Sequence, residues 1–116
     1  MTLIRDREVV KVDKSDNGKG YLLRDMLLEG ELLGGILSYM SIITLEPGCA
    51  IGPHLHSEEN EVYYIIEGTG VYYDNGEEYE VQAGDLVVCD LGQSHGLENT
   101  GDTTMRFVAV MQEPRE

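Results

Sequence analysis

Three histidines and one glutamate are spaced so that they could bind a metal ion. His54 and His56 are separated by one residue, so their side chains project from the same face of an extended segment. Glu61 would lie on the opposite face of an unbroken strand, but the polar residues 57–60 predict a turn that brings it back to the pair. His95 follows a second turn, far along the chain. Three imidazoles and one carboxylate suit a first-row divalent metal.

An isolated His-x-His pair is more often two unrelated histidines, so the residues around the pair decide its meaning. Gly48 to Gly68 reads G-x5-H-x-H-x4-E-x6-G, and Gly84 to Asn99 reads G-x5-D-x-G-x2-H-x3-N. These segments resemble the two motifs of the cupin superfamily, separated here by residues 69–83, the short gap of compact prokaryotic members. The first motif (48–68) is matched at every position. The second (84–99) departs at Asp90, where the family usually has proline.

The resemblance implies a fold and a cofactor. The implied fold is an all-β cupin jelly-roll β-barrel, also called a double-stranded β-helix. We expect a single domain over residues 1–116, because the chain is too short for a family member with two barrels. The cofactor is one divalent transition metal ion (Mn, Fe, Ni or Zn). By position in the motifs, its ligands would be His54, His56, Glu61 and His95.

The resemblance also implies a range of activities. The chain is most similar to the small, single-domain, oxalate-decarboxylase-like cupins of the cupin 2 type. This favours a metal-dependent decarboxylase or dioxygenase that acts on a small chelating carboxylate or enol. Two alternatives stay open: a binding or sensor module that keeps the metal without turnover, and a purely structural metal site. Glu58 and Glu59 could serve as a general base, although solvated loop charges are the commoner reading.

Several further side chains could line the barrel or contact a substrate. Tyr63 shares the inward parity of Glu61, so it could bond a metal ligand or substrate, or simply pack. The arginines could bind a carboxylate, although surface ion pairing is their more common role. Cys49 and Cys89 are interpreted as small buried apolar residues. The candidate substrate contacts are Tyr63, Tyr72, Tyr39, Met40, Arg24 and Arg106.

The distribution of apolar residues independently predicts an all-β chain. Short runs rich in β-branched residues, Tyr and Leu alternate with turn signals, and Asn75-Gly76 is the clearest hairpin turn. No apolar pattern keeps a helical period for three turns. The predicted strands are Glu8–Val12, Tyr21–Leu28, Ile36–Leu45, Val62–Ile66, Gly70–Tyr73, Glu77–Gln82, Leu86–Cys89 and Met105–Met111, with a short extended piece at Gly96–Asn99.

Composition excludes several classes of partner. With 22 acidic and 8 basic residues, the net charge of −14 repels nucleic acid and anionic membrane surfaces. No apolar run approaches the roughly 20 residues that span a bilayer. Charges interrupt the N-terminal residues before a signal-peptide core could form, and two cysteines make no disulfide framework. These observations favour a cytoplasmic protein, and the resemblance implies that its partner is a small, chelating molecule.

Both faces of one predicted strand are apolar. Val62, Tyr64 and Ile66 alternate with Tyr63 and Ile65, whereas a two-sheet fold needs only one apolar face per strand. The second face must therefore be covered. A homodimer partner is the favoured explanation, and the N-terminal segment of the same chain is the alternative.

Overall fold

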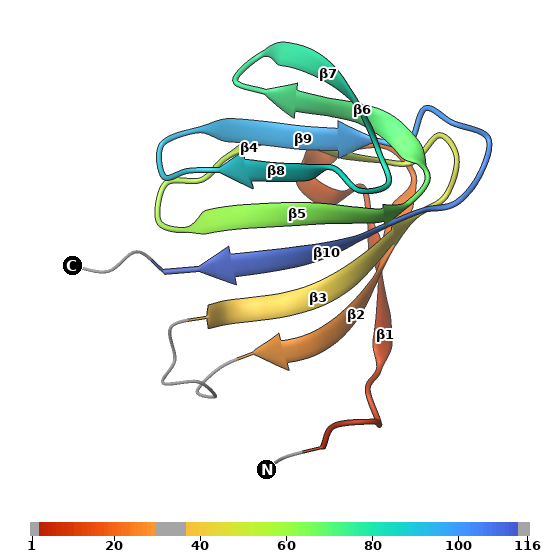
Figure 1. The fold of residues 1–116 in the computed structure, drawn as a ribbon, viewed down its shortest axis with the longest axis vertical. Helices are drawn as coiled ribbons and strands as arrows, with labels where there is room; N and C mark the ends of the chain where they lie inside the picture. The colour runs from red at the N-terminus through yellow and green to blue at the C-terminus, as the bar shows by residue number, and fades with distance from the viewer. Residues whose placement is uncertain (1–2, 30–36, 114–116) are drawn as a thin grey trace.

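The computed structural model describes residues 3–29 and 37–113, which form two facing antiparallel sheets (Figure 1). All strand pairs are antiparallel, and the arrangement confirms the predicted all-β class. The six-stranded sheet contains, in order, β1 (Val9–Asp13), β2 (Tyr21–Glu29), β3 (Leu37–Leu45), β10 (Met105–Gln112), β5 (Asn60–Glu67) and β8 (Leu86–Cys89). The four-stranded sheet contains β4 (Ala50–Leu55), β9 (Ser94–Glu98), β6 (Thr69–Asp74) and β7 (Glu77–Gln82).

The core lies between the two sheets and follows from the alternation of the strands. Tyr63 and Ile65 of β5 point inward, as do Phe107 of β10 and Leu45 of β3, and all four are buried. Leu97 of β9 meets them from the opposite sheet. Beside this core lies a cavity lined by Asp16, Arg24, His54, His56 and Glu61 together with apolar side chains.

The structure reproduces the predicted strands and adds one more, β4. Each predicted strand lies within one or two residues of an observed one, except that Ile36, the predicted start of β3, lies outside the described residues. β4 was not among the predicted strands, and β9 was predicted only in part, as the extended piece Gly96–Asn99, because Gly52-Pro53 and Gly96 interrupt their β-propensity. In the part of the chain that the structure describes, no helix is long and apolar enough to cross a membrane.

An irregularity in β4 turns the histidine pair inward. The pairing of β4 with β9 shifts between Ile51 and His54, so one extra residue is accommodated on β4. Ile51 therefore packs in the core, and His54 and His56 also face the interior, although they have the opposite parity along the chain. His54 is the direct cross-strand partner of His95.

A tight left-handed turn holds the N-terminal region against β4. The turn η1 (Ser15–Asn17) has positive φ at Asp16 (52°) and Asn17 (60°). Its backbone approaches β4 so closely that a Cβ at Gly52 would lie 2.1 Å from the Asp16 carbonyl oxygen, and one at Gly18 would overlap the Ala50 carbonyl. Glycine is therefore required at both positions for steric reasons. This contact carries Asp16 to the rim of the cavity, beside His54.

Candidate metal centre

Four side chains from three strands and one loop converge inside the barrel. The His56 Nε2 atom lies 3.0 Å from His54 Nε2 and 2.9 Å from His95 Nε2. The Glu61 Oε1 atom lies 2.9 Å from His95 Nε2 and 3.2 Å from His56 Nε2. All four potential ligand atoms lie within 4.8 Å of one another, and three of the four residues are buried. The set predicted by the motif resemblance is therefore brought together.

The separations between these atoms fit a metal ion better than they fit hydrogen bonds. Three imidazole Nε2 atoms that face one another cannot all be satisfied by mutual hydrogen bonding, because each nitrogen is either a donor or an acceptor. Ligand atoms about 2.1 Å from one ion and at right angles to each other are about 3.0 Å apart, whereas tetrahedral ligands are about 3.4 Å apart. The four separations of 2.9–3.2 Å match right-angled ligands, and all six pairs of atoms lie within 4.8 Å. Such a set could hold a divalent metal and leave coordination positions open.

The other ring nitrogens of the histidines have partners that fix their orientation. The Nδ1 atom of His54 lies 2.9 Å from the carbonyl oxygen of Gly52, which can only accept, so Nδ1 carries the proton and Nε2 presents a lone pair to the cluster. Asp16 Oδ2 lies 3.3 Å from the same nitrogen. The Nδ1 atom of His95 lies 2.9 Å from the hydroxyl of Tyr72, which can accept a hydrogen bond from Nδ1 when Nε2 binds a metal. Sequence reasoning did not find Asp16, whose signal was the Asp16-Asn17-Gly18 turn.

Burial and hydrogen bonding set the charge of the cluster. Burial alone would raise the pKa of Glu61, but hydrogen bonds from His95 and Tyr39, together with the nearby imidazoles, outweigh it and lower the pKa. Burial, together with the neighbouring imidazoles, lowers the pKa of His56 in spite of Glu61. The 3.2 Å contact between His56 and Glu61 is therefore not a salt bridge at neutral pH. The set combines a carboxylate with a neutral imidazole, the forms that bind a metal.

Tyrosine hydroxyls surround the ligands. Tyr39 donates a 2.6 Å hydrogen bond to Glu61 Oε2, and burial beside that carboxylate raises the pKa of Tyr39. Tyr63 stacks on His95 with ring centroids 4.8 Å apart and an angle of 25°, and its hydroxyl lies 3.4 Å from His95 Nε2. Burial also raises the pKa of Tyr63, so its hydroxyl stays protonated at neutral pH. Tyr39, Tyr63 and Tyr72 therefore all point inward, toward the potential ligands.

The cluster opens onto a small cavity that contains one arginine. The cavity has a volume of about 200 Å³. Arg24 lines it beside Tyr39, and its Nε atom is buried with no hydrogen-bond partner among the described residues. At about 30 Å³ per water, this volume corresponds to about six or seven waters, or a ligand of similarly few heavy atoms. A larger hollow of about 480 Å³ lies beside Glu80 and Asp85 and contains no histidine.

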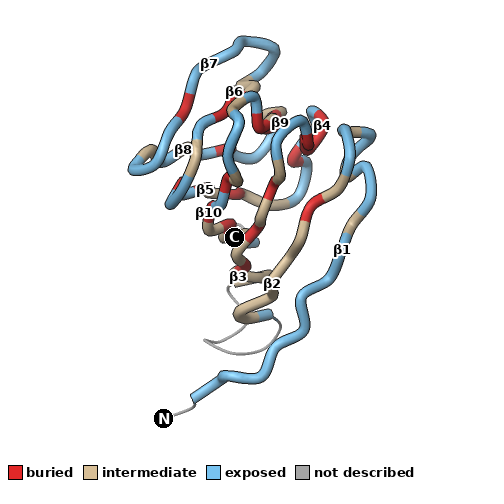
Figure 2. Tube along the Cα trace, turned by 90° about the vertical axis from the view of Figure 1, so that its right-hand side faces the viewer, coloured by how far each residue is buried: buried red, intermediate tan, exposed pale blue. Residues whose placement is uncertain are grey.

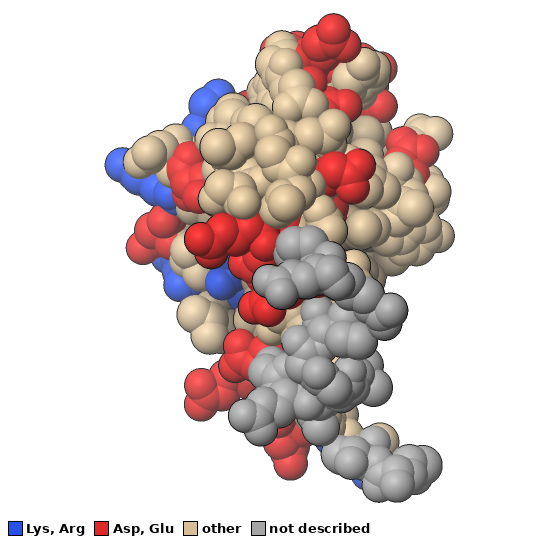
Figure 3. All heavy atoms as spheres, turned by 90° about the vertical axis from the view of Figure 1, so that its left-hand side faces the viewer, with Lys and Arg blue, Asp and Glu red and all other residues tan. Residues whose placement is uncertain are grey.

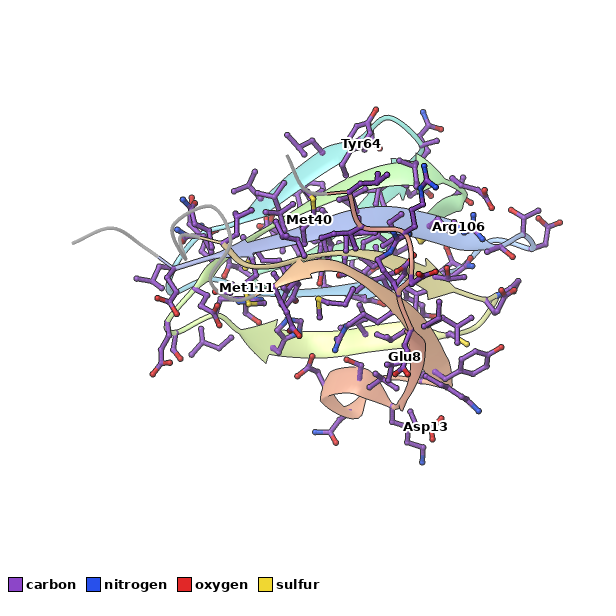
Figure 4. All side chains as sticks on the ribbon, turned by 90° about the horizontal axis from the view of Figure 1, so that it is seen from below. Glu8, Asp13, Met40, Tyr64, Arg106 and Met111 are labelled. Atoms are coloured by element: carbon purple, nitrogen blue, oxygen red, sulfur yellow. The ribbon has the colours of Figure 1, made fainter. Side chains whose placement is uncertain are left out.

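Two of the candidate substrate contacts lie on the wrong side of the sheet. Met40 alternates with the inward-facing Tyr39 and Ser41, so it projects from the outer face of β3. Arg106 alternates with buried Met105 and Phe107 and lines an outer groove. Figure 4 shows both residues on the same outer side of the sheet. Strand parity therefore corrects the expectation that Met40 lines the barrel and that Arg106 reaches a substrate at this centre.

The second motif keeps its turn without the proline of the family. The Asp90 backbone N–H donates to Gln93 Oε1 at 2.9 Å, and the Gln93 N–H donates back to the Asp90 carbonyl at 3.0 Å. Proline has no N–H and could not make the first bond. Asn99, the last residue of the motif, is fully buried and donates to the Leu45 and Thr103 carbonyls. These residues position the strand that carries His95.

Acidic side chains outnumber basic ones around this end of the protein. Figure 3 shows the face at the left-hand side of Figure 1, where many Asp and Glu side chains and few Lys and Arg side chains are visible. This agrees with the net charge of −14. Such a surface attracts cations and repels anions.

Removing the Tyr72 hydroxyl should weaken metal binding. In the Tyr72→Phe variant, the Nδ1 atom of His95 loses the hydroxyl that orients the imidazole ring. Removing a hydrogen-bond partner of a metal-binding histidine typically weakens metal affinity by about 10–100-fold. Tyr73→Phe is the matched control, because the Tyr73 hydroxyl donates to Glu98, away from the cluster. We expect at least a tenfold higher Kd for Mn²⁺ in the first variant and no change in the second, measured by calorimetric titration. Equal affinities in the two variants would contradict this role for Tyr72.

The fold and the cluster define a class: jelly-roll barrels that enclose a candidate metal site of three histidines and one carboxylate. The chain belongs to the cupin family, because the family described as "Cupin domain" matches residues 41–111. It is 36% identical over 111 residues to the oxalate-binding protein of Thermotoga maritima, covering 94% of this chain and 92% of that protein. The family predicted from the two motifs is thereby confirmed.

Other relatives broaden this comparison. The tetracenomycin polyketide synthase protein TcmJ of Streptomyces glaucescens is 32% identical over 82 residues, which is 71% of this chain and 55% of that protein. A crystal structure described as a predicted oxalate decarboxylase from Thermotoga maritima superposes with a TM-score of 0.93 and 34% identity, covering 97% of this chain and all of that one. A cupin barrel protein from Salinispora arenicola, at 21% identity, 97% and 90% coverage and a TM-score of 0.77, supports the fold alone.

Proposed function

We propose that this chain binds a small chelating carboxylate or enol on a divalent metal and acts on it as a metal-dependent decarboxylase or dioxygenase. The observation that carries the proposal is the cavity of about 200 Å³ in which the ligand cluster faces Arg24, whose Nε atom is buried and unpaired. A buried donor without a partner is costly, and a ligand carboxylate would satisfy it. The name of the oxalate-binding relative supports the same ligand class.

Each residue has a separate task in this proposal. His54, His56, Glu61 and His95 would hold the metal, which supplies a Lewis acid that polarises a chelating oxygen ligand. Arg24 would donate to the outer carboxylate oxygens of the ligand and so select an anion. Tyr39 and Tyr63 would hold the metal-binding side chains of Glu61 and His95 in place. The apolar side chains of Ile43 and Met111, which line the same cavity, would limit the space left for water.

A second candidate function is binding without turnover. It is favoured by the relative named for binding oxalate, and by the scarcity of carboxyl groups among the described cavity residues, which are Asp16 and Glu61 alone. Glu61 would be occupied by the metal, which leaves Asp16 at the rim as the carboxyl group that could move a proton. Protein loaded separately with Mn²⁺, Fe²⁺ or Ni²⁺ and supplied with oxalate, diketones or hydroxy acids distinguishes the two: product formation supports the enzyme, and retention of unchanged ligand supports the binding module.

Arg24 provides a direct test of ligand recognition. A charge-assisted hydrogen bond is worth about 1.5–3 kcal/mol, so Arg24→Gln should weaken oxalate binding to the metal-loaded protein by about 10–100-fold. Arg106→Gln is the matched control, because Arg106 lies on the outer face of the same sheet. Metal content, measured by elemental analysis, should be the same in both variants. Unchanged oxalate affinity in Arg24→Gln would rule out Arg24 as the anion-recognition residue.

We further propose that the chain forms one cupin domain, that it assembles as a homodimer and that it works in the cytoplasm. Cys49 and Cys89 are both buried as free thiols, as is usual in reducing compartments. Burial, reinforced by nearby carboxylates, raises the pKa of Cys89 to about 11, and its thiol donates to the carbonyl of Gln93.

A further inference from the structure

Two side chains of opposite charge line the cavity of the metal centre without pairing with each other. Arg24 of β2 has a buried Nε atom with no hydrogen-bond partner among the described residues. Asp16 of the turn η1 lines the same space of about 200 Å³, and no ion pair of the described residues joins the two. A ligand held between them would therefore meet a hydrogen-bond donor on one side and an acceptor on the other.

The Asp16 carboxylate keeps capacity to accept a hydrogen bond. Its Oδ2 atom lies 3.3 Å from Nδ1 of His54, but the proton on that nitrogen is directed to the Gly52 carbonyl, which is closer at 2.9 Å. The hydrogen bond that the described residues donate to this carboxylate is a long one, from Ser15 Oγ at 3.5 Å. Because an ionised carboxylate has about four lone-pair sites, Asp16 can accept a further bond from a ligand.

Backbone contacts fix the place of Asp16 at the cavity. Figure 2 shows the exposed strand β1 rising toward the buried part of β4, against which η1 packs. Lys19 and Ala50 exchange two backbone hydrogen bonds beside the close approach of Asp16 to Gly52. Lys14 and Asp16 have φ of 45° and 52°, and for a lysine this conformation costs roughly 1–2 kcal/mol. The turn is therefore a fixed part of the cavity wall and not a loose loop.

The pairing of Arg24 with Asp16 across one cavity discriminates between small acids. A dicarboxylate offers acceptors at both ends, and its second carboxylate would meet the like charge of Asp16. An oxo acid also presents an acceptor beside its carboxylate. A 2-hydroxycarboxylate has two oxygens that can chelate a metal, and its hydroxyl keeps a proton to donate. Its carboxylate suits Arg24 and its hydroxyl suits Asp16.

We propose that Asp16 determines ligand specificity and that the centre prefers a small 2-hydroxycarboxylate to an oxo acid or a dicarboxylate of similar size. The inference rests on the proposed function and narrows its ligand class. A site that accepts a hydrogen bond from a hydroxyl disfavours the analogue without one, because its polar group then loses a partner. The Asp16 side chain is 45% exposed, so water can replace part of the lost bond and moderates the preference.

Lactate and pyruvate are matched probes for this preference. They have equal charge and equal numbers of heavy atoms, and they differ in a hydroxyl donor against a carbonyl acceptor. Calorimetric titration of the Mn²⁺-loaded full chain should give a Kd for lactate about tenfold below the Kd for pyruvate, which is the worth of one hydrogen bond. Elemental analysis of each preparation verifies its metal loading, and the ratio of the two Kd values cancels any difference in that loading.

Two substitutions of Asp16 keep the turn and change the preference. Asparagine tolerates the left-handed conformation, and its amide both donates and accepts, so Asp16→Asn should bring the ratio of Kd values to about one. The loss of the like charge should also tighten oxalate binding by about threefold. Glycine adopts positive φ without strain, so Asp16→Gly should raise the Kd for lactate by about tenfold and leave that for pyruvate unchanged.

Asp13→Asn is the control for the change in net charge. Asp13 ends β1, its side chain is 77% exposed, and it does not line the cavity. This variant should keep the wild-type ratio of the two Kd values. A ratio that changes equally in Asp13→Asn and Asp16→Asn would show a general charge effect and overturn the role of Asp16.

The outcomes separate this inference from the proposed function. A wild-type protein that binds oxalate, yet binds lactate no more tightly than pyruvate, overturns the inference and leaves the proposed function standing. A lactate preference that survives in both Asp16 variants also overturns it, because another residue must then read the hydroxyl. Failure of all three acids to bind the metal-loaded protein contradicts the proposed function itself, and the inference with it.

Discussion

Replacing His56 with alanine is expected to abolish stable metal binding, because His56 contacts all three of the other potential ligands. Binding free energies of about 10–16 kcal/mol for structural four-ligand Zn²⁺ sites correspond to about 2.5–4 kcal/mol for each ligand. At 1.4 kcal/mol per factor of ten, a loss of this size would raise the Kd for Mn²⁺ by about 60–700-fold. Elemental analysis of the purified variant, together with calorimetric titration, measures this change.

Leu55→Ala is the control for this substitution. Leu55 precedes His56 at the end of β4, but its side chain points outward and is 63% exposed. Its removal should leave metal content at the wild-type level. Circular dichroism should show folded protein in both variants at 20 °C. Wild-type affinity in His56→Ala would mean that the protein holds its metal at another site.

Gly52→Ala is expected to have the largest effect on stability. A Cβ at this position would lie 2.1 Å from the carbonyl oxygen of Asp16, and neither of the two backbone segments can move freely. We expect a decrease of about 3 kcal/mol in the free energy of unfolding and a melting temperature lower by roughly 10 °C. Metal affinity should decrease as well, because the Gly52 carbonyl fixes the orientation of His54.

Gly76→Ala separates steric overlap from backbone strain. Gly76 has a φ of 87° in the hairpin turn, but nothing lies within 4 Å of the position of an added Cβ. Its substitution should therefore cost about 1–2 kcal/mol from the left-handed conformation alone and leave metal affinity unchanged. Thermal melts followed by circular dichroism compare the two variants. Equal losses of stability would show that the overlap at Gly52 is relieved by backbone movement.

Much of the centre could be predicted from local spacing. The His-x-His pair, the turn through residues 57–60 and the parity of Glu61 with Tyr63 required only the period of a strand and the position of a turn. His95 could be added because its motif resembles that of a known family. The all-β class followed from short apolar runs between turns, and the family comparisons confirm it.

The remaining features depend on contacts between distant segments. The shift in β4 that allows Ile51 and His54 to share one side is defined by the pairing with β9, and no local pattern specifies it. No local pattern specifies the approach of Asp16 to His54 either, because it requires both Gly18 and Gly52, which lie in different segments of the chain. The errors for Met40 and Arg106 arose because apolar or cationic character alone does not say which face of a strand a residue occupies.

The tyrosines around the ligands also give the protein an internal optical probe. The chain has seven tyrosines and no tryptophan, so tyrosine emission is not lost by energy transfer to an indole. Tyr39, Tyr63 and Tyr72 each touch a potential ligand through a hydroxyl, and one of them stacks on an imidazole. Paramagnetic ions at the centre would lie within a few ångströms of these three rings and quench their fluorescence. Occupancy of the centre can therefore be followed in the unlabelled, unmodified chain.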